Sequence, residues 1–147
     1  MNTSIATLLE RKGGTLRTVP HTLTVVEAVQ EMNRHKIGSV VVMDGQSLVG
    51  IFTERDVLRR VVGGGLDPLL TPVTEVMTTN VATIEAVKTV QEAMDMFQER
   101  RCRHLPVTKD GELLGLISIG DVSRWVAGTY RAEAESLRQY IAGGLTV

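Results

Sequence analysis

Two hydroxyl residues, each followed three positions later by an aspartate, have the types and spacing best suited to binding chemistry in this sequence. Thr53 precedes Asp56 in GIFTERD, and Ser118 precedes Asp121 in GLISIGD. Each pair follows a short apolar run and opens an amphipathic segment, which predicts a junction between a strand and a helix. Such a junction suits a polar ligand, and a carboxylate there can accept hydrogen bonds from two neighbouring hydroxyls of a sugar. Asp56 and Asp121 therefore suit a ribose, and a phosphate must be bound elsewhere.

The same spacing also has a purely structural interpretation. A hydroxyl residue with an acid three positions later is the capping-box pattern, in which the hydroxyl caps a helix and the acid returns to the N–H of the capping residue. A duplicated helix would keep its duplicated cap. The pattern alone leaves both interpretations open.

Candidate phosphate ligands lie near both junctions but differ between them. Arg55 and Arg59 flank Asp56, whereas the second copy has Gly120 in place of Arg55 and carries Arg103 and His104 where its first strand begins. Arginine offers permanently charged, bidentate recognition, and histidine would make binding sensitive to pH. The alternative, a solvated helix face, is favoured for Arg59, Arg60 and Arg124.

The two junctions belong to an internal repeat. Sliding the chain on itself by 65 positions places residues 24–61 over 89–126 without a gap, and 11 of 38 aligned positions are identical. A repeat of this size marks two copies of one supersecondary unit. Each copy is too small to bury its own sheet, so we expect the two to pack face to face.

Periodicity and turn residues predict the elements that position the junctions. In the first copy we expect an extended lead-in at 16–19, helices at 24–36 and 55–62, and strands at 39–43 and 48–52 around an Asp44-Gly45 turn. The helix at 55–62 should bury Val57, Leu58, Val61 and Val62. In the second copy we expect a short helix at 73–77, a lead-in at 81–84, helices at 89–101 and 119–127, and strands at 105–108 and 113–118 around an Asp110-Gly111 turn.

Two further helices lie outside the repeat. We expect one at residues 3–12, ended by Gly13-Gly14, and an amphipathic one at 131–142, closed by Gly143-Gly144. The second could fold back on the repeats or join two subunits. The proline-containing stretch 66–72 is the expected link, so the predicted division is 1–65, 66–127 and 128–147.

Composition indicates a globular chain with no charge bias. The chain has 147 residues, of which 43% are hydrophobic and 22% charged, and its formal net charge is −1. This balance gives no reason to expect nucleic acid or a membrane surface as partner. Cys102 is the single cysteine, which excludes an intramolecular disulfide and favours a reducing cytoplasm. The N-terminal residues lack the pattern of a signal peptide, and no apolar run is long enough to span a membrane.

Signs of catalysis are weak. The sequence contains neither a G-x-x-x-x-G-K-[ST] loop nor G-x-G-x-x-G after a strand, so the Gly63–Gly65 run is better interpreted as a linker. Histidines 21, 35 and 104 show no metal-ligand spacing. Cys102 and His104 would share a strand face, but no third orienting group is evident. We therefore expect no enzyme, no catalytic residues, no metal and no required cofactor.

Several motifs together resemble a known family. GIFTERD and GLISIGD, the RHLPV stretch from Arg103 to Val107, and PVTEVMT at the start of the second copy look like tandem cystathionine-β-synthase (CBS) domains. The resemblance covers about residues 5–127. It implies an α/β (α+β) fold of two β-α-β-β-α units packed sheet to sheet about a pseudo-twofold axis, here with short N- and C-terminal helices, and often a disc-shaped homodimer.

The resemblance also implies a function. CBS pairs act as sensors that bind AMP, ADP, ATP, S-adenosylmethionine or, in some members, NAD(H), so we expect an adenine-nucleotide-binding regulatory module for energy or redox sensing. It would signal to an unknown target protein through ligand-dependent conformation or assembly. The competing hypothesis is a ligand-free dimerisation or interaction module.

The family's ligand-binding positions transfer to this sequence residue by residue. The resemblance implies that Asp56 and Asp121 hold ribose hydroxyls and that Thr53 and Ser118 lie near the phosphate. The lead-in of the opposite unit would contribute Thr18 to the Asp121 site and Thr83 to the Asp56 site. Ser39 and His104 are equivalent positions at strand starts. Because Gly38-Ser39 replaces Arg103-His104 in the first copy, the phosphate contact there would fall to Arg55.

Overall fold

The computed structural model describes residues 2–13 and 16–145, and the chain forms two compact units. The first-repeat unit is Thr15–Ala82, and the second-repeat unit combines Met1–Gly14 with Thr83–Val147. These units differ from the division at residues 65 and 127, which follows the repeat copies along the sequence. The N-terminal segment groups with the second repeat, and residues 66–82 group with the first.

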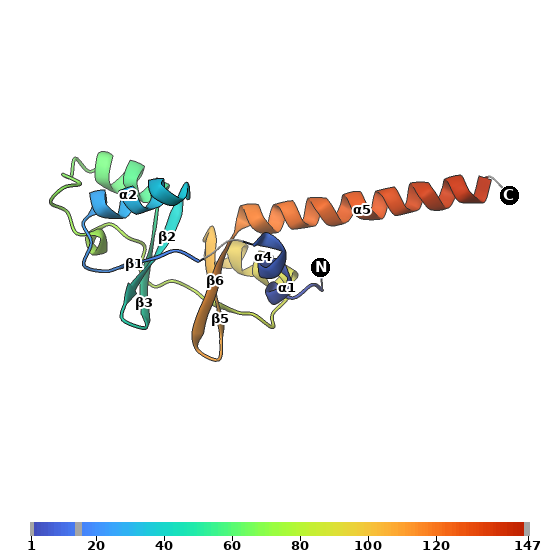
Figure 1. Cartoon of the computed structure of the whole chain (residues 1–147), viewed down its shortest axis with the longest axis horizontal. Coiled ribbons are helices and arrows are strands. Elements are labelled where there is room, and N and C mark those ends of the chain that lie inside the picture. Colours follow the sequence, from blue (N-terminus) through green and yellow to red (C-terminus); the bar gives the residue numbers. More distant parts are fainter. Residues whose placement is uncertain (1, 14–15, 146–147) are drawn as a thin grey trace. The chain divides into compact units, whose positions relative to one another are not determined.

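The first-repeat unit is a three-stranded sheet in the order β1-β2-β3 (Figure 1). Its elements are β1 (Thr18–Pro20), α2 (Val25–His35), β2 (Ser39–Asp44), β3 (Ser47–Thr53), α3 (Glu54–Asp56), the π-helix η1 (Val57–Val62) and the 3₁₀ turn η2 (Val73–Glu75). β1 runs parallel to β2, with α2 as the connection, and β2 forms an antiparallel hairpin with β3. The predicted lead-in, helix and hairpin are confirmed.

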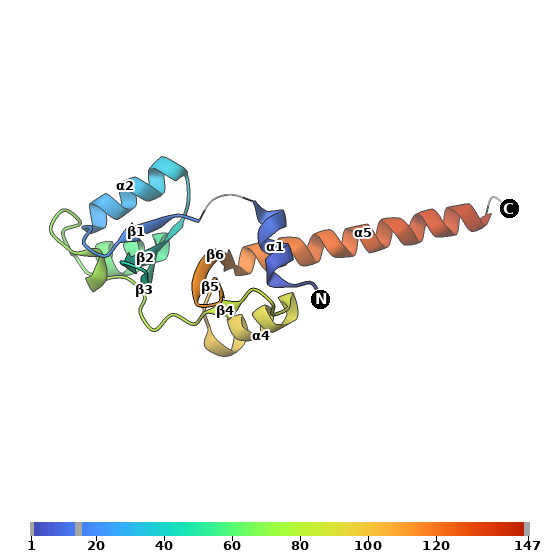
Figure 2. The same ribbon diagram turned by 60° about the horizontal axis from the view of Figure 1, so that its bottom comes forward.

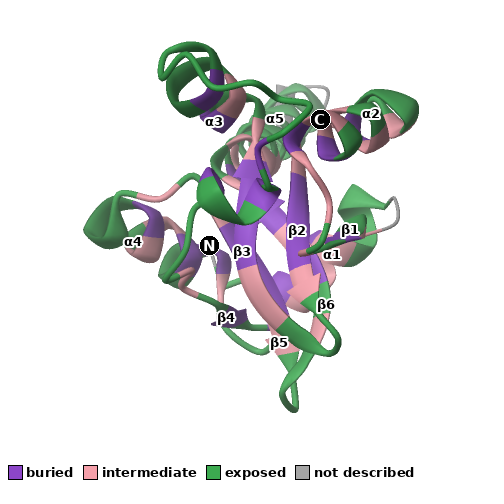
Figure 3. Cartoon of the chain, turned by 90° about the vertical axis from the view of Figure 1, so that its left-hand side faces the viewer, coloured by how far each residue is buried: buried purple, intermediate pink, exposed green. Residues whose placement is uncertain are grey.

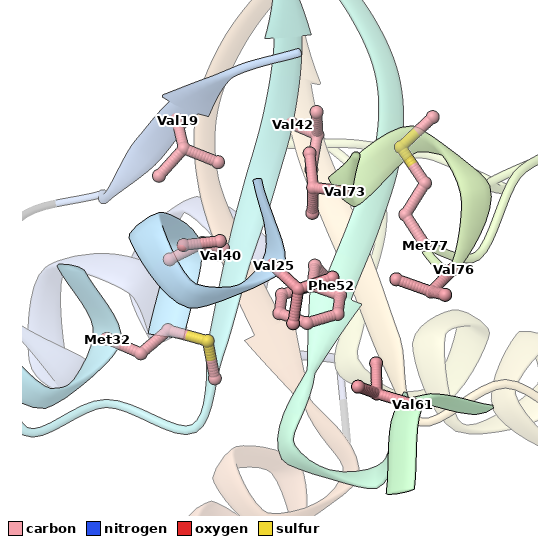
Figure 4. Packing of buried hydrophobic residues seen from close by; sticks show 11 residues of the cluster. Val19, Val25, Met32, Val40, Val42, Phe52, Val61, Val73, Val76 and Met77 are labelled. Carbon is pink, nitrogen blue, oxygen red and sulfur yellow. The ribbon is translucent and has the colours of Figure 1, made fainter. Parts of the chain in front are cut away.

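The core of this unit lies between the sheet, α2, η1 and residues 73–77 (Figure 4). Val40, Val42 and Phe52 from the hairpin pack with buried residues of α2. The buried side chains Val73, Val76 and Met77 come from the segment after the link. Burial is concentrated at the centres of β2 and β3 and falls away toward the hairpin tip (Figure 3). Residues 73–77 are therefore an integral part of the first unit's core.

The second-repeat unit repeats this topology. Its elements are α1 (Ile5–Lys12), β4 (Ile84–Glu85), α4 (Val90–Arg100), β5 (His104–Lys109), β6 (Glu112–Ser118) and α5 (Ile119–Leu145). The sheet order is β4-β5-β6, with a parallel and then an antiparallel pair. The strand register shifts after Val107 here and after Val42 in the first unit, at the same 65-residue offset. The predicted repeat is thus confirmed down to its irregularity.

α1 completes the second unit as residues 72–78 complete the first. The amide of Ile5 donates to the Lys88 carbonyl at 2.8 Å, and the amide of Val90 donates to the Thr3 carbonyl at 2.8 Å. The first unit has the matching pair from Val73 to Leu23 and from Val25 to Thr71, both at 2.9 Å. α1 crosses the start of α5, where the Arg11 guanidinium lies 5.3 Å from the Trp125 ring centroid (Figure 2).

The two helices between lead-in and hairpin begin and end as predicted. Thr24 and Thr89 form complete capping boxes with Glu27 and Glu92. Each helix ends at a residue in the left-handed conformation, Lys36 or Arg101. For α1 the cap is Ser4, and Gly13 ends it at φ +66°; Gly14 lies outside the described residues.

The prediction of one regular helix at 55–62 was wrong. One α-turn, α3, is followed by a π-helix, in which an amide donates to the carbonyl five positions earlier, as the Gly63 amide does to the Leu58 carbonyl at 2.9 Å. Val61 remains buried, but Leu58 and Val62 are 66% and 68% exposed instead of facing the core.

Two boundaries also differ from expectation. The predicted helices at 119–127 and 131–142 are one continuous helix, α5, that passes through Gly128 and Gly143. The first hairpin turns at Gly45-Gln46 rather than at Asp44-Gly45, whereas the second turns at Asp110-Gly111 as predicted. The Asp-Gly pairs are offset by one position between copies, and the shared strand register decides where the chain turns.

Among the described residues, none of the helices is long and apolar enough to cross a membrane.

Candidate functional site

The first junction is a complete capping box. The Thr53 amide and hydroxyl lie 3.0 and 3.2 Å from Asp56 Oδ2, and the Asp56 amide donates to Thr53 Oγ1 at 3.3 Å. β3 positions Thr53 because it pairs with Ser39 at the start of β2. The structural interpretation of this motif is therefore confirmed for Asp56 Oδ2.

The other oxygen of the buried Asp56 carboxylate has longer contacts. Thr78 Oγ1 lies 3.5 Å from Oδ1, and Arg60 Nε lies 3.7 Å away. Arg60 Nη1 donates to the carbonyls of Val76 and Met77 at 3.2 and 2.9 Å, which holds the guanidinium along that segment. Oδ1 thus retains capacity to accept a short hydrogen bond.

The second junction has the same cap but a different environment. The Ser118 amide donates to Asp121 Oδ2 at 2.8 Å, and the Asp121 amide donates to Ser118 Oγ at 3.1 Å. Lys12 Nζ also lies 2.8 Å from Oδ2, and Arg124 Nη2 lies 2.7 Å from Oδ1. Both oxygens of this carboxylate therefore have a cation at hydrogen-bond distance.

The environment of Asp121 affects its acidity. Burial raises its pKa, but hydrogen bonds from Lys12 and the Ser118 amide, with the positive charge of Lys12, outweigh burial, so the net pKa lies below its usual range. The carboxylate is thus held ionised by groups of its own chain.

The predicted strand-start residues lie beside the junctions within each unit. Ser39 pairs with Thr53, and His104 pairs with Ser118. The first amide after each hydroxyl residue donates to the residue before the strand: Glu54 to Gly38 and Ile119 to Arg103, both at 3.0 Å. The structure therefore brings Ser39 to the Asp56 junction and Arg103 and His104 to the Asp121 junction.

The remaining predicted residues are exposed. Arg55 follows Thr53 by two positions on the solvent side of its turn, and the Arg103 side chain is exposed. Thr18 belongs to the unit of Asp56 and Thr83 to the unit of Asp121, and both are exposed. Their predicted pairing with the aspartate of the opposite unit stays a prediction.

Sequence reasoning missed four residues that contact the aspartates. Arg60 and Arg124, assigned to solvated faces, lie four and three positions after Asp56 and Asp121, a spacing that predicts such pairs on a helix. Thr78 was not considered. Lys12 is 109 positions from Asp121, and only its place in α1, whose role matches that of residues 72–78, could have indicated it.

Two observations bear on metal and thiol chemistry. Within the described part of the chain, no three histidine, cysteine, aspartate or glutamate side chains are grouped as metal ligands. Burial raises the pKa of the Cys102 thiol, which lowers the thiolate fraction that a nucleophile requires.

The comparisons with known proteins agree with this architecture. The CBS domain family matches residues 15–63 and 73–128 of the chain. The chain belongs to the CBS domain family. The "CBS domain-containing protein CBSX3, mitochondrial" of Arabidopsis thaliana is 40% identical over 126 residues, 82% of this chain and 61% of that protein. This CBS domain chain thus covers less than two thirds of that relative's length.

Two solved structures illustrate the likeness. The CBS-domain containing protein ATU1752 from Agrobacterium tumefaciens is 41% identical, covers 83% of this chain and 98% of its own, and superposes with a TM-score of 0.76. The CBS domain protein PAE2072 from Pyrobaculum aerophilum, complexed with AMP, is 27% identical, covers 80% and 88%, and has a TM-score of 0.71. CBS domain proteins are typically regulatory and nucleotide-binding, and the match indicates no catalytic family.

Proposed function

We propose that this chain is a regulatory CBS pair that binds an adenine nucleotide and signals energy or redox state through ligand-dependent conformation or assembly. AMP, ADP and ATP are the proposed ligands, with NAD(H) and S-adenosylmethionine as further candidates. The AMP complex of the Pyrobaculum relative supports this class of ligand. The proposal includes no catalytic activity, and the target protein is left open.

The observation that carries the proposal is the state of the Asp56 carboxylate. Its Oδ2 is fixed by Thr53 at 3.0 Å, while its Oδ1 has neighbours only at 3.5 and 3.7 Å among its described contacts. A buried carboxylate whose orientation is fixed by one oxygen and whose other oxygen can accept short hydrogen bonds fits the 2′- and 3′-hydroxyls of a ribose. Ser39 beside Thr53 adds a further hydroxyl for the ligand.

A ligand-free interaction module is the second candidate. It is favoured by the two capping boxes, which give both aspartates a complete structural role. The two candidates differ in whether the chain binds a nucleotide, since the capping role requires none.

Thermal unfolding with AMP, ADP, ATP, S-adenosylmethionine and NADH separates these candidates. A ligand at 100 times its dissociation constant stabilises the fold by about 2.7 kcal/mol. We expect at least one adenosine compound to raise the melting temperature. An unchanged melting temperature with all five would favour the interaction module.

Substituting Asp56→Asn tests the ribose assignment. Asparagine keeps a carbonyl oxygen for the cap but loses the ionised acceptor, so we expect the affinity for the active nucleotide to fall about tenfold or more. Asp44→Asn, which removes an exposed carboxylate at the end of β2, is the matched control and should bind normally. Equal affinity of both variants would contradict the role of Asp56.

Assembly and compartment complete the proposal. We propose a homodimer in which the exposed part of α5 contacts a second copy, and a reducing compartment such as the cytoplasm on account of the single Cys102.

A further inference from the structure

The two ribose-type carboxylates differ in what already occupies them. Asp56 Oδ1 has no described contact shorter than 3.5 Å, whereas both oxygens of Asp121 have cationic groups of the same chain within 2.8 Å. A ribose hydroxyl that donates to Asp121 must therefore compete with an existing charge-assisted hydrogen bond. The first junction carries no such competition at that distance.

Of the two cations on Asp121, Lys12 is the more firmly placed. Its ammonium donates a second hydrogen bond to the Leu116 carbonyl at 2.7 Å, and its side chain is 36% exposed. Arg124 is 75% exposed and has only its contact from within the same helix among those described, so a ligand could displace it at small cost. Lys12 is also anchored by α1, whose amide bonds and buried Ile5 and Leu8 fix the helix on the second unit.

The equivalent segment of the first unit lacks this arrangement. There residues 72–78 take the place of α1, and the group that they offer to the aspartate is the neutral Thr78 hydroxyl at 3.5 Å. The difference arises because α1 continues helically to Lys12, whereas the 3₁₀ turn ends at Glu75 and Thr78 forms an extended bridge with Ile51. The segment that completes each unit thus offers a charged ammonium to Asp121 and a neutral hydroxyl to Asp56.

We propose that Lys12 determines which junction accepts the nucleotide: it keeps Asp121 closed by an intramolecular ion pair, so that one adenosine ligand binds per chain, at Asp56. This inference rests on the proposed function. It makes Lys12 a selectivity residue that acts through charge: from the capping oxygen Oδ2 it neutralises the Asp121 carboxylate and weakens Oδ1 as an acceptor for the ribose. Without Lys12, the exposed Arg124 alone would remain at Oδ1, and the second junction would accept the same class of ligand.

Isothermal titration of the full chain with AMP tests the assignment. We expect one AMP per chain for the wild type and two for Lys12→Met, which removes the ammonium but keeps the aliphatic stem. Lys109→Met, an exposed lysine at the end of β5, is the matched control and should bind one. Circular dichroism and the melting temperature establish that each variant is folded.

A second substitution locates the sites. Asp56→Asn should lose the single wild-type site, whereas Lys12→Met with Asp56→Asn should retain one AMP per chain. Two AMP per wild-type chain, or one per Lys12→Met chain, would overturn the role of Lys12 while leaving nucleotide binding intact. If no form binds AMP or the other four compounds, the proposed function fails and the selectivity role falls with it.

Discussion

The two aspartates show how one local motif acquires different chemistry from distant neighbours. In both, the carboxylate completes a helix cap at its own hydroxyl residue. The distinguishing contacts are supplied by α1 for Asp121 and by the segment around Thr78 for Asp56. Because charge-assisted hydrogen bonds are stronger than neutral ones, a single lysine suffices to make equivalent positions inequivalent.

The ion pair of Lys12 predicts a pH effect on stability. The folded-state pKa of Asp121 is depressed, so the stabilisation from its carboxylate is complete above about pH 4, the usual Asp range, and is lost as the pH falls through the folded pKa. Lys12→Met should raise the pKa of Asp121 and lower the free energy of unfolding at neutral pH by about 1 kcal/mol. The loss should shrink toward low pH.

NMR titration of the Asp121 carboxyl carbon together with urea unfolding at several pH values measures both effects. Lys109→Met again serves as the control, since its lysine is exposed at a strand end. An Asp121 pKa that does not move in Lys12→Met would show that the ion pair is absent in solution, independently of any nucleotide.

At the scale of elements, each hairpin has a glycine closely approached by another segment, residues 72–78 in the first unit and α1 in the second. A Cβ at Gly50 would lie 2.5 Å from Met77 Sδ and 2.9 Å from the Thr78 carbonyl oxygen. At Gly115 the nearest atoms are the ends of the Leu9 side chain, the closest at 2.9 Å. Backbone cannot move as readily as a side-chain end, so the two glycines are not equally constrained.

Alanine at these two positions should therefore have unequal costs. Overpacking costs about 1–3 kcal/mol, and we expect Gly50→Ala to fall at the upper end because it strikes the β3–Thr78 backbone bridge. Gly115→Ala should fall at the lower end, since Leu9 can change rotamer. Urea unfolding of the two variants compares them directly, and a Gly115→Ala cost equal to or above that of Gly50→Ala would contradict this interpretation of the packing.

Elements whose causes are local could be predicted from the sequence. The helices that start at Thr24 and Thr89, the strands and the 65-residue repeat all follow from short-range patterns, and the structure confirms them. Whether α1 and residues 72–78 join the other repeat copy depends on long-range hydrogen bonds, and the repeat boundaries do not reveal it.

The errors have equally specific causes. A pattern of 3.6 residues per turn placed Leu58 and Val62 inside, but the segment is a π-helix of which only Val61 is buried. In the candidate site, the hydroxyl residues and the aspartates could be found from their spacing, whereas Lys12 could be found only by knowing where α1 packs. The predicted helix end at residue 127 was wrong because an exposed glycine such as Gly128 costs a helix only about 1 kcal/mol.

At the scale of the whole molecule, the second half of α5 is exposed to solvent. Residues 131–143 are exposed throughout, and the helix extends beyond the rest of its unit (Figure 1). Isolated helices of this length are marginal in water, so an additional contact would stabilise it. Its apolar side chains recur with a heptad spacing, at Ala127, Tyr130, Ala134, Leu137 and Ile141.

The charges beside this seam favour a parallel pairing with a second copy. In the heptad that the seam defines, Glu133 takes position g and Arg138 the following position e, which face each other between parallel helices. An antiparallel pair would instead bring Arg131 toward the partner subunit's Arg138. The same charges thus support one orientation and oppose the other.

The last prediction follows from this pattern. Leu137→Glu with Ile141→Glu places charges in the apolar seam and should convert a dimer into a monomer by light scattering after size exclusion, while Gln139→Glu on the outer face should not. Glu133→Arg should weaken the dimer about tenfold, because it sets like charges against Arg138, and adding Arg138→Glu should restore it. Restoration is the decisive outcome, since only a parallel pair joins these two positions. An unchanged dimer in the seam variant would show that assembly uses another surface.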